Sequence, residues 1–250
     1  MSYAEIWALL LIATMGHVMA AIWYLAYRNE WTFCSKKIYA IKIGEKQLRR
    51  ELLNSIHSPI HAVLLAAFLY AGLFAERSWT GFFITLVIAF VWAEIWHYVS
   101  HRAFHLKSLH WIHAEHHKSH VNSPFTAISF SFWEKLIFDL GYLVVLAGLD
   151  LVLPLNFYGI AGWYVGYLIV NSVSHANFEF RPRGYNAVLG KLLTTTTYHS
   201  LHHSRYTGNY GLATRTLDQI FKTEWTDYEK LYTRVTGDGP PLSSLRERVD

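Results

Sequence analysis

The sequence has few charged residues and a single cysteine. Charged side chains make up 16% of its 250 residues, whereas a soluble domain carries about 25%, so the chain lacks the polar surface that would cover it in water. Sparse charge and abundant apolar residues also exclude a disordered chain. The lone Cys34 excludes a disulfide framework, a four-cysteine zinc ribbon and an iron–sulfur cluster within the chain.

What the chain has instead is long apolar runs. Hydrophobic residues make up 52% of it, and a helix needs about 20 mostly apolar residues to cross a bilayer. We therefore expect an all-α integral membrane protein with four to five transmembrane helices, the last two forming a hairpin, and a cytoplasmic histidine-rich helical cap. The first run is too long for a signal peptide and lacks a basic leader, so it should be a retained span. The runs cover 6–27, 59–75, 78–96, 136–155 and 155–173.

The basic residues predict how the chain is oriented in the membrane. Lys and Arg collect in the cytoplasmic loops of membrane proteins, and 21 of the 22 fall within 28–58, 97–135 and 176–250. These segments lie on one side of a five-span topology, and only Arg77 lies on the other. We expect that side to face the cytoplasm, in a bacterial inner membrane or the endoplasmic reticulum. Because topology accounts for the positive charge, we expect no nucleic-acid partner.

Histidine is the residue in excess. The chain has 15 histidines, and those that follow the third and fifth apolar runs all fall on the predicted cytoplasmic side. On a helix, residues three and four apart share a face, so His97, His101 and His105 should form one stripe. The spacing H-x-x-H-H occurs twice, at 113–117 and at 199–203, and on a helix it should place the first histidine of each run on one face beside the other two.

Such a concentration of imidazoles favours a metal site. Adjacent protonatable groups repel one another when charged and are costly to desolvate, unless a metal takes them as ligands, and neutral imidazole is the commonest protein ligand. Tetrahedral zinc takes four ligands, so eight or nine imidazoles suit two ions. Nitrogen donors with open positions suit redox-active iron, while zinc also fits by affinity.

Four histidine-containing segments of the chain resemble sequence motifs of a known protein family. Residues 96–105, Trp-His-Tyr-Val-Ser-His-Arg-Ala-Phe-His, resemble the first histidine box of the fatty acid hydroxylase/sterol desaturase superfamily, in the form of the sterol methyl oxidases. Residues 113–117, His-Ala-Glu-His-His, resemble its second box, and 174–178, Ser-His-Ala-Asn-Phe, are similar to an isolated histidine segment after its last span. Residues 198–211, which end in Asn-Tyr-Gly, resemble its third box. The resemblance runs from about 80 to 225 and is specific to the superfamily rather than to a substrate.

The resemblance implies two iron ions, which zinc could replace in purified protein, held by nine histidines. These are His101, His105, His113, His116, His117, His175, His199, His202 and His203. His97 matches a histidine found in only part of the family, so it is either a tenth ligand or a neighbour that supports one, and His120 could act in either way. The expected structural histidines are His17, His57, His61 and His110. Glu94, one turn before His97, either orients a ligand imidazole or extends to the membrane interface.

The resemblance also implies an oxidoreductase of lipid metabolism. We expect a membrane-bound di-iron, O2-dependent monooxygenase that hydroxylates an aliphatic C–H bond of a sterol, a fatty acyl chain or a related membrane lipid. The alternative within the superfamily is a lipid desaturase. An alternative of a different class is a metal-ion transporter or another metal-binding membrane protein, but a transporter should hold its ligands near the midplane, where only His17 is expected.

The chain also lacks a recognisable site for an electron-carrying cofactor. It has no G-x-G-x-x-G motif and no P-loop, so a separate cytochrome, ferredoxin or reductase should supply electrons. Basic residues of the tail either dock such an acidic donor or form ordinary solvated surface: Lys191, Arg205, Arg215 and Lys222. We expect residues 1–75 to form an N-terminal membrane-anchoring region with a basic cytoplasmic loop, and residues 76–250 to form the fatty acid hydroxylase-like catalytic domain.

Overall fold

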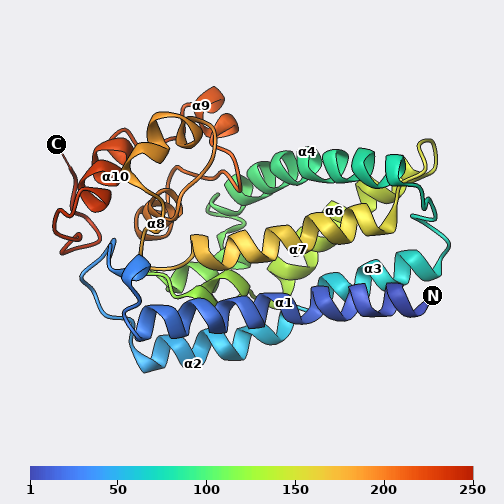
Figure 1. Cartoon of the computed structure of the whole chain (residues 1–250), viewed down its shortest axis with the longest axis horizontal. Helices are drawn as coiled ribbons and strands as arrows, with labels where there is room; N and C mark the ends of the chain where they lie inside the picture. The colour runs from blue at the N-terminus through green and yellow to red at the C-terminus, as the bar shows by residue number, and fades with distance from the viewer. Residues whose placement is uncertain (250) are drawn as a thin grey trace.

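Long helices that run side by side make up the apolar part of the chain (Figure 1). The structure, a computed structural model, describes residues 1–249. Within these residues there is no β-strand, only isolated bridges between single residues, so the all-α prediction is confirmed for them. The α-helices are α1 (Tyr3–Arg28), α2 (Glu45–Asn54), α3 (Ile60–Tyr70), α4 (Trp79–Phe104), α5 (His110–His113), α6 (Phe132–Asp150), α7 (Phe157–Ser174), α8 (Thr196–Arg205), α9 (Thr216–Phe221) and α10 (Tyr228–Thr236).

Three helical segments are long and apolar enough to cross a membrane. They are α1, the run Glu45–Tyr70 that joins α2 to α3 through a 3-10 turn, and α4, each of 26 residues. Large apolar side chains on their outer faces have no protein cover, such as Trp7, which is 70% exposed, and Val87, which is 61% exposed. Because a monomeric soluble protein does not leave such long apolar faces uncovered, this is the pattern of a membrane protein.

The fourth and fifth predicted spans correspond to α6 and α7. Both are helical, with 19 and 18 residues, but neither belongs to the three helices that qualify as spans by length and composition. Helix α6 carries Glu134, Lys135, Asp139 and Asp150, which lower its hydropathy. The turn between the two helices is fixed by polar side chains, because Asp150 accepts the backbone N–H groups of Phe74 and Leu155 at 2.9 and 2.6 Å.

The packing of the helices leaves a core between them and places the histidine-bearing segments at one end. Helix α7 packs against α1 and α4, and α3 packs against α6. The first 75 residues contribute Leu9, Ile12 and Leu65 to the same core as Leu143 and Ile160. Helices α8, α9 and α10 gather at the end of the bundle opposite to the N-terminus (Figure 1).

Candidate metal centre

The structure gathers nine histidines into two adjacent groups. In each group the candidate ligand atoms all lie within 4.8 Å of one another. The first group is His101, His105, His113, His117 and His202, and the second is His116, His175, His199 and His203. These are the nine positions that the resemblance implies, and each group has the four or five imidazoles that one ion requires.

The groups are assembled from four parts of the chain. The end of α4 supplies His101 and His105, the segment after it supplies 113–117, the C-cap of α7 supplies His175, and α8 supplies 199–203. The sequence predicts a single helical face for 113–117, but α5 ends at His113 and a 3-10 turn begins at His116. The prediction of one helix is therefore wrong.

The two H-x-x-H-H runs divide between the groups in the same way, although only the second lies on a regular helix: the histidines four residues apart share a group, and the one between them joins the other. The rings of His116 and His117 stand at 86° to each other, so these neighbours point into different groups. On the regular helix α8, His202 joins the first group, while His199 and His203, four residues apart, both join the second.

Backbone carbonyl groups orient most of these imidazoles. Because a carbonyl oxygen can only accept, each Nδ1 that faces one must carry the ring proton, which leaves the Nε2 lone pair for a metal. The acceptors are Tyr210 for His101 (3.1 Å), Ser129 for His116 (3.1 Å), Asn171 for His175 (2.9 Å), Gly208 for His202 (2.8 Å) and Ser119 for His203 (3.1 Å).

The Nε2 atoms point at one another at short range. Nε2 of His199 lies 2.8 Å from that of His175 and 3.1 Å from that of His203. Because the Nδ1 atoms of His175 and His203 carry the ring protons, the Nε2 atom of each has only a lone pair. His199 Nε2 could carry one proton, and one proton cannot form hydrogen bonds to both lone pairs. A cation at the centre would satisfy all three, so the donor set fits a metal ion.

The surroundings of these histidines favour the neutral imidazole, which is the form that binds a metal ion. Burial lowers the pKa of His105 to about 3 and that of His116 to about 4. Burial, followed by the repulsion of neighbouring imidazoles, holds the pKa of His117 and His203 well below the ordinary value. Near neutral pH these rings are therefore uncharged, as a metal ligand must be.

One carboxylate supports this centre, and it is not the one that the sequence suggests. Glu134 accepts a hydrogen bond from Nδ1 of His113 at 2.5 Å, and both side chains are buried. Glu94 neither orients an imidazole nor extends to the interface, because it accepts the backbone N–H groups of Ala213 and Thr214 at 3.0 and 2.8 Å. Glu134 lies in the first turn of α6, outside every histidine box, so spacing gave no signal for it.

The remaining histidines lie outside both groups. His97 packs edge-on against His101, with 4.8 Å between ring centroids, and stacks on Phe138. Nδ1 of His120 lies 3.1 Å from the Tyr206 hydroxyl, and the ring of His110 lies 6.0 Å from that of His105. Three more contact polar groups: His17 with Ser55, His57 with the Phe130 carbonyl and His61 with Asp139.

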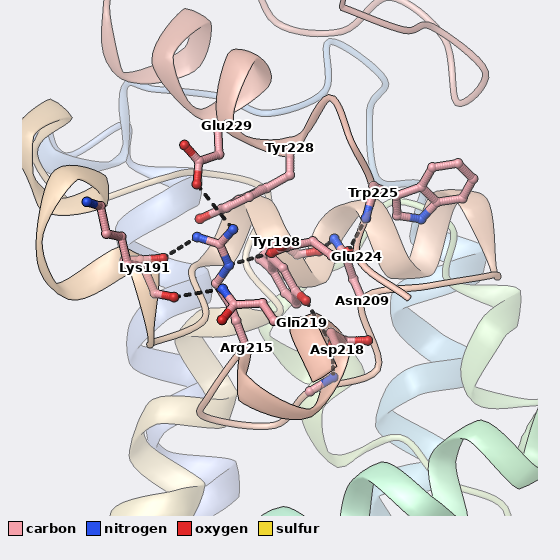
Figure 2. Close-up of polar contacts among 12 residues, drawn as sticks. Lys191, Tyr198, Asn209, Arg215, Asp218, Gln219, Glu224, Trp225, Tyr228 and Glu229 are labelled. Carbon is pink, nitrogen blue, oxygen red and sulfur yellow. Dashed lines mark hydrogen bonds and ion pairs between the residues drawn. The ribbon is translucent and has the colours of Figure 1, made fainter. Parts of the chain in front are cut away.

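A buried polar network fixes the segment that follows α8 (Figure 2). Asp218 accepts hydrogen bonds from the Tyr198 hydroxyl at 2.8 Å and from the backbone N–H groups of Tyr210 and Gly211 at 3.0 and 2.7 Å. Asn209 donates to the Tyr198 carbonyl and accepts from the N–H of Trp225. This network places the Tyr210 carbonyl, the acceptor for His101.

Two basic residues that the sequence offers for docking an electron donor are buried. Arg215 binds Glu224, Glu229 and the Gly190 carbonyl (Figure 2). The guanidinium of Arg205 binds Asp227 through two bonds of 2.6 and 2.9 Å. That role is therefore wrong for these two residues, because both cations are already paired inside the fold, whereas Lys191 and Lys222 are exposed.

A cavity adjoins the histidines between α3, α4, α6 and α7. The empty space within it, with the open space at its mouth included, is about 760 Å³. Apart from histidines, most of the residues that line the cavity are aromatic or apolar, including Trp96, Phe138 and Trp163. The histidines that line it are His61, His97, His101, His113, His116, His175 and His199.

Fold and site together define a histidine-rich membrane protein whose imidazole cluster can hold metal. The fatty acid hydroxylase family model matches residues 86–223, which is more than half of the chain, so the chain belongs to that family. The superfamily assignment is thus confirmed, while the likeness of the first box to the sterol methyl oxidases stays a prediction.

Plant enzymes are among the curated proteins that this chain is similar to. Very-long-chain aldehyde decarbonylase GL1-7 of Oryza sativa subsp. japonica is 30% identical over 62% of this chain and 25% of its own length. GL1-6 of subsp. indica is 32% identical over 63% and 26%, and CER1 of Arabidopsis thaliana is 32% identical over 60% and 24%. The chain therefore spans about a quarter of the length of these relatives. No solved structure matches it.

Proposed function

We propose that the protein is a membrane-bound lipid oxidase that uses two iron ions and O2, and that it hydroxylates an aliphatic C–H bond. The observation that carries the proposal is the pair of imidazole groups beside a cavity lined by aromatic side chains. Two metal sites without an adjoining cavity would fit a storage protein, and a cavity without them would fit a carrier.

The nine histidines of the two groups would hold the metal. Iron bound there would supply oxidation by O2, chemistry that no protein side chain provides, and zinc could occupy the same nitrogen donors. The chain's own part is to keep the imidazoles neutral, to orient them through carbonyl acceptors and Glu134, and to exclude water from the buried side of the cavity. His97, which lines the cavity but lies outside both groups, is proposed as a residue that supports His101.

The membrane arrangement of the proposal follows the charge pattern. Helices α6 and α7 would lie in the bilayer as a hairpin beside the three spans, residues 1–75 would serve as the anchor, and residues 76–250 would carry the catalytic domain. The histidine end would face the cytoplasm of a bacterial inner membrane or the endoplasmic reticulum. A separate cytochrome, ferredoxin or reductase would deliver electrons there.

The relatives and the superfamily supply alternatives for the reaction. A desaturase would remove a second hydrogen instead of adding oxygen, and the names of the plant relatives bring in very-long-chain aldehydes as substrates. A metal transporter is less well supported, because the grouped histidines come from the end of α4, the end of α7 and the cap rather than from mid-span positions.

Labelled oxygen distinguishes these reactions. Cells that express the protein or its His202→Ala variant would first be compared by lipidomics, which identifies the lipid that changes. Conversion of that lipid under ¹⁸O2 should then add one labelled oxygen atom to the product. An unlabelled alkene would indicate desaturation, and conversion without O2, or equal conversion by His202→Ala, would refute the oxidase.

A further inference from the structure

A second polar cluster lies in the cavity, separate from the two histidine groups. It consists of His61 on α3, Lys135 and Asp139 on α6, and Tyr164 on α7, and we call these four residues the polar cluster. All four line the cavity, and each is at most 6% exposed. Buried charged groups are costly among apolar helices, and where they occur they usually serve a function.

Most of the polar cluster is internally paired. The Lys135 ammonium lies 2.7 Å from the Asp139 carboxylate and donates to the Tyr164 hydroxyl at 2.7 Å. The His61 ring stacks flat on that of Tyr164, with 3.4 Å between centroids. Because Lys135 neutralises Asp139, the cluster can remain buried without net charge from this pair.

One ring nitrogen atom of the polar cluster is left without a partner. Nδ1 of His61 lies 3.1 Å from Oδ1 of Asp139, and a carboxylate paired with Lys135 can only accept, so Nδ1 carries the ring proton. Nε2 of His61 is then a bare lone pair, buried, with no hydrogen-bond partner among residues 1–249. It requires a donor, which a bound molecule in the cavity can provide.

Lys135 offers the complementary group. An ammonium has three N–H donors. One bonds the Tyr164 hydroxyl, and one can be shared by the two Asp139 oxygens, which lie 2.8 and 2.7 Å from Nζ, so one donor is left for a ligand. The cluster also lies close to the metal centre, because Glu134, which binds His113, precedes Lys135 in the sequence. In addition, Lys135 lies over the ring of Phe130, which stacks on His116.

We propose that the polar cluster binds the hydroxyl group at the end of a long-chain lipid alcohol. A hydroxyl group donates to Nε2 of His61 and accepts from Lys135, so it satisfies both free positions. An aldehyde and an ionised carboxylate can only accept, so neither can donate to Nε2 of His61, and a hydrocarbon can neither donate nor accept. If that lipid is the substrate, which rests on the proposed function, the reacting carbon lies near the oxygen-bearing end of the chain.

Ligand binding tests this without turnover. The purified protein in lipid nanodiscs would be incubated with tritiated octadecan-1-ol, and octadecan-1-ol, octadecanal, octadecanoate and octadecane would compete for the site. We expect the alcohol to compete at concentrations about tenfold lower than the other three, because one buried hydrogen bond separates it from the aldehyde.

The matched variants are His61→Phe and His17→Phe. His61→Phe keeps a ring against Tyr164 and removes the nitrogen atoms, so it should weaken alcohol binding about tenfold and leave octadecane unchanged. His17→Phe makes the same change in α1, outside the cavity, and should bind as the unaltered protein does. If His61→Phe elutes as aggregate, the double variant Lys135→Met/Asp139→Asn, which removes both charges together, should show the same selective loss.

The outcomes separate the polar cluster from the proposed function. Equal competition by octadecan-1-ol and octadecane, or full alcohol binding by the variants of the cluster, would overturn the hydroxyl site even if the protein oxidises lipids. Alcohol-selective binding that depends on His61 would support the site, and it would do so even if no O2-dependent product formed, a result that would refute the oxidase alone.

Discussion

The Glu134 carboxylate accepts a hydrogen bond from Nδ1 of His113 at 2.5 Å, with both side chains buried. Among the nine grouped histidines, His113 is the one whose Nδ1 donates to a carboxylate. In five others Nδ1 donates to a backbone carbonyl oxygen: His101, His116, His175, His202 and His203. A carboxylate makes its partner imidazole a stronger donor to a metal. The first group, which contains His113, therefore depends on a residue from α6.

Replacing that carboxylate should weaken metal binding. We expect Glu134→Ala to lower the metal affinity of the first group by about 10–100-fold, the usual effect of removing an outer partner of a ligand histidine. Metal content after dialysis against a graded chelator measures it. Glu134→Gln, which can still accept from Nδ1, should lose less.

The control for this prediction is Glu115→Gln. Glu115 lies between the ligands of the second box, but its carboxylate binds Asn54 and Arg50 rather than an imidazole. The metal content of the Glu115→Gln variant should match that of the unaltered protein. If Glu134→Ala retains metal as firmly as Glu115→Gln does, Glu134 has no part in the centre.

The division into two groups predicts how metal is lost. His105→Ala removes a ligand of the first group and His199→Ala one of the second, so each variant should retain about one ion of two, held by the intact group. Elemental analysis of the purified proteins gives the ratio of metal to protein. His110→Ala, outside both groups, should keep two ions, and a variant that loses both ions at once would show one coupled site.

The metal centre was more predictable from the sequence than its surroundings. Histidine boxes are local in sequence, so the resemblance to the family implies the nine positions that the structure groups. Which group each box contributes to depends on how four separate segments of the chain pack together, and the spacing within a box cannot reveal that packing. His61 was expected to be structural, since neither Asp139 nor Tyr164 is near it in sequence and only the packing of three helices joins them.

The helical spans show the same limit. The five apolar runs predict helices that the structure contains as α1, α3, α4, α6 and α7, but α6 carries charged side chains and does not qualify as a span by composition. Lys135, for example, is paired with Asp139 on the same helix and with the Tyr164 hydroxyl on α7, and composition alone does not distinguish a paired charge from an exposed one.

Asp218 should be a positioning residue for the third histidine box. Asp218→Asn replaces one carboxylate oxygen by an N–H donor that faces other donors, so about two of its hydrogen bonds are lost, at a cost of roughly 1–3 kcal/mol in stability. Displacement of the Tyr210 carbonyl would also loosen His101. We therefore expect both a lower unfolding temperature and weaker metal retention.

Asp238→Asn provides the comparison for Asp218→Asn. Asp238 is 85% exposed in its side chain and lies 3.9 Å from Lys36, a surface pair that contributes little, so its variant should behave as the unaltered protein does. A purely structural role for Asp218 would lower the unfolding temperature of the metal-free protein and leave the metal affinity of the folded fraction unchanged.

Gly141 on α6 is required for the position of Trp96 in the cavity wall. A Cβ atom at Gly141 would lie 2.1 Å from Cζ2 of Trp96, whereas one at Gly148, two turns further along α6, would meet nothing within 4 Å. Gly141→Ala should therefore cost about 1–3 kcal/mol by overpacking and displace an indole whose Nε1 donates to the Phe138 carbonyl at 2.9 Å. Gly148→Ala should be neutral or slightly stabilising, since alanine favours helices. Thermal unfolding measures the stability of both variants, and lipid conversion should fall for Gly141→Ala alone. If the two variants have equal unfolding temperatures and equal lipid conversion, the Trp96 indole can move without loss of stability or activity.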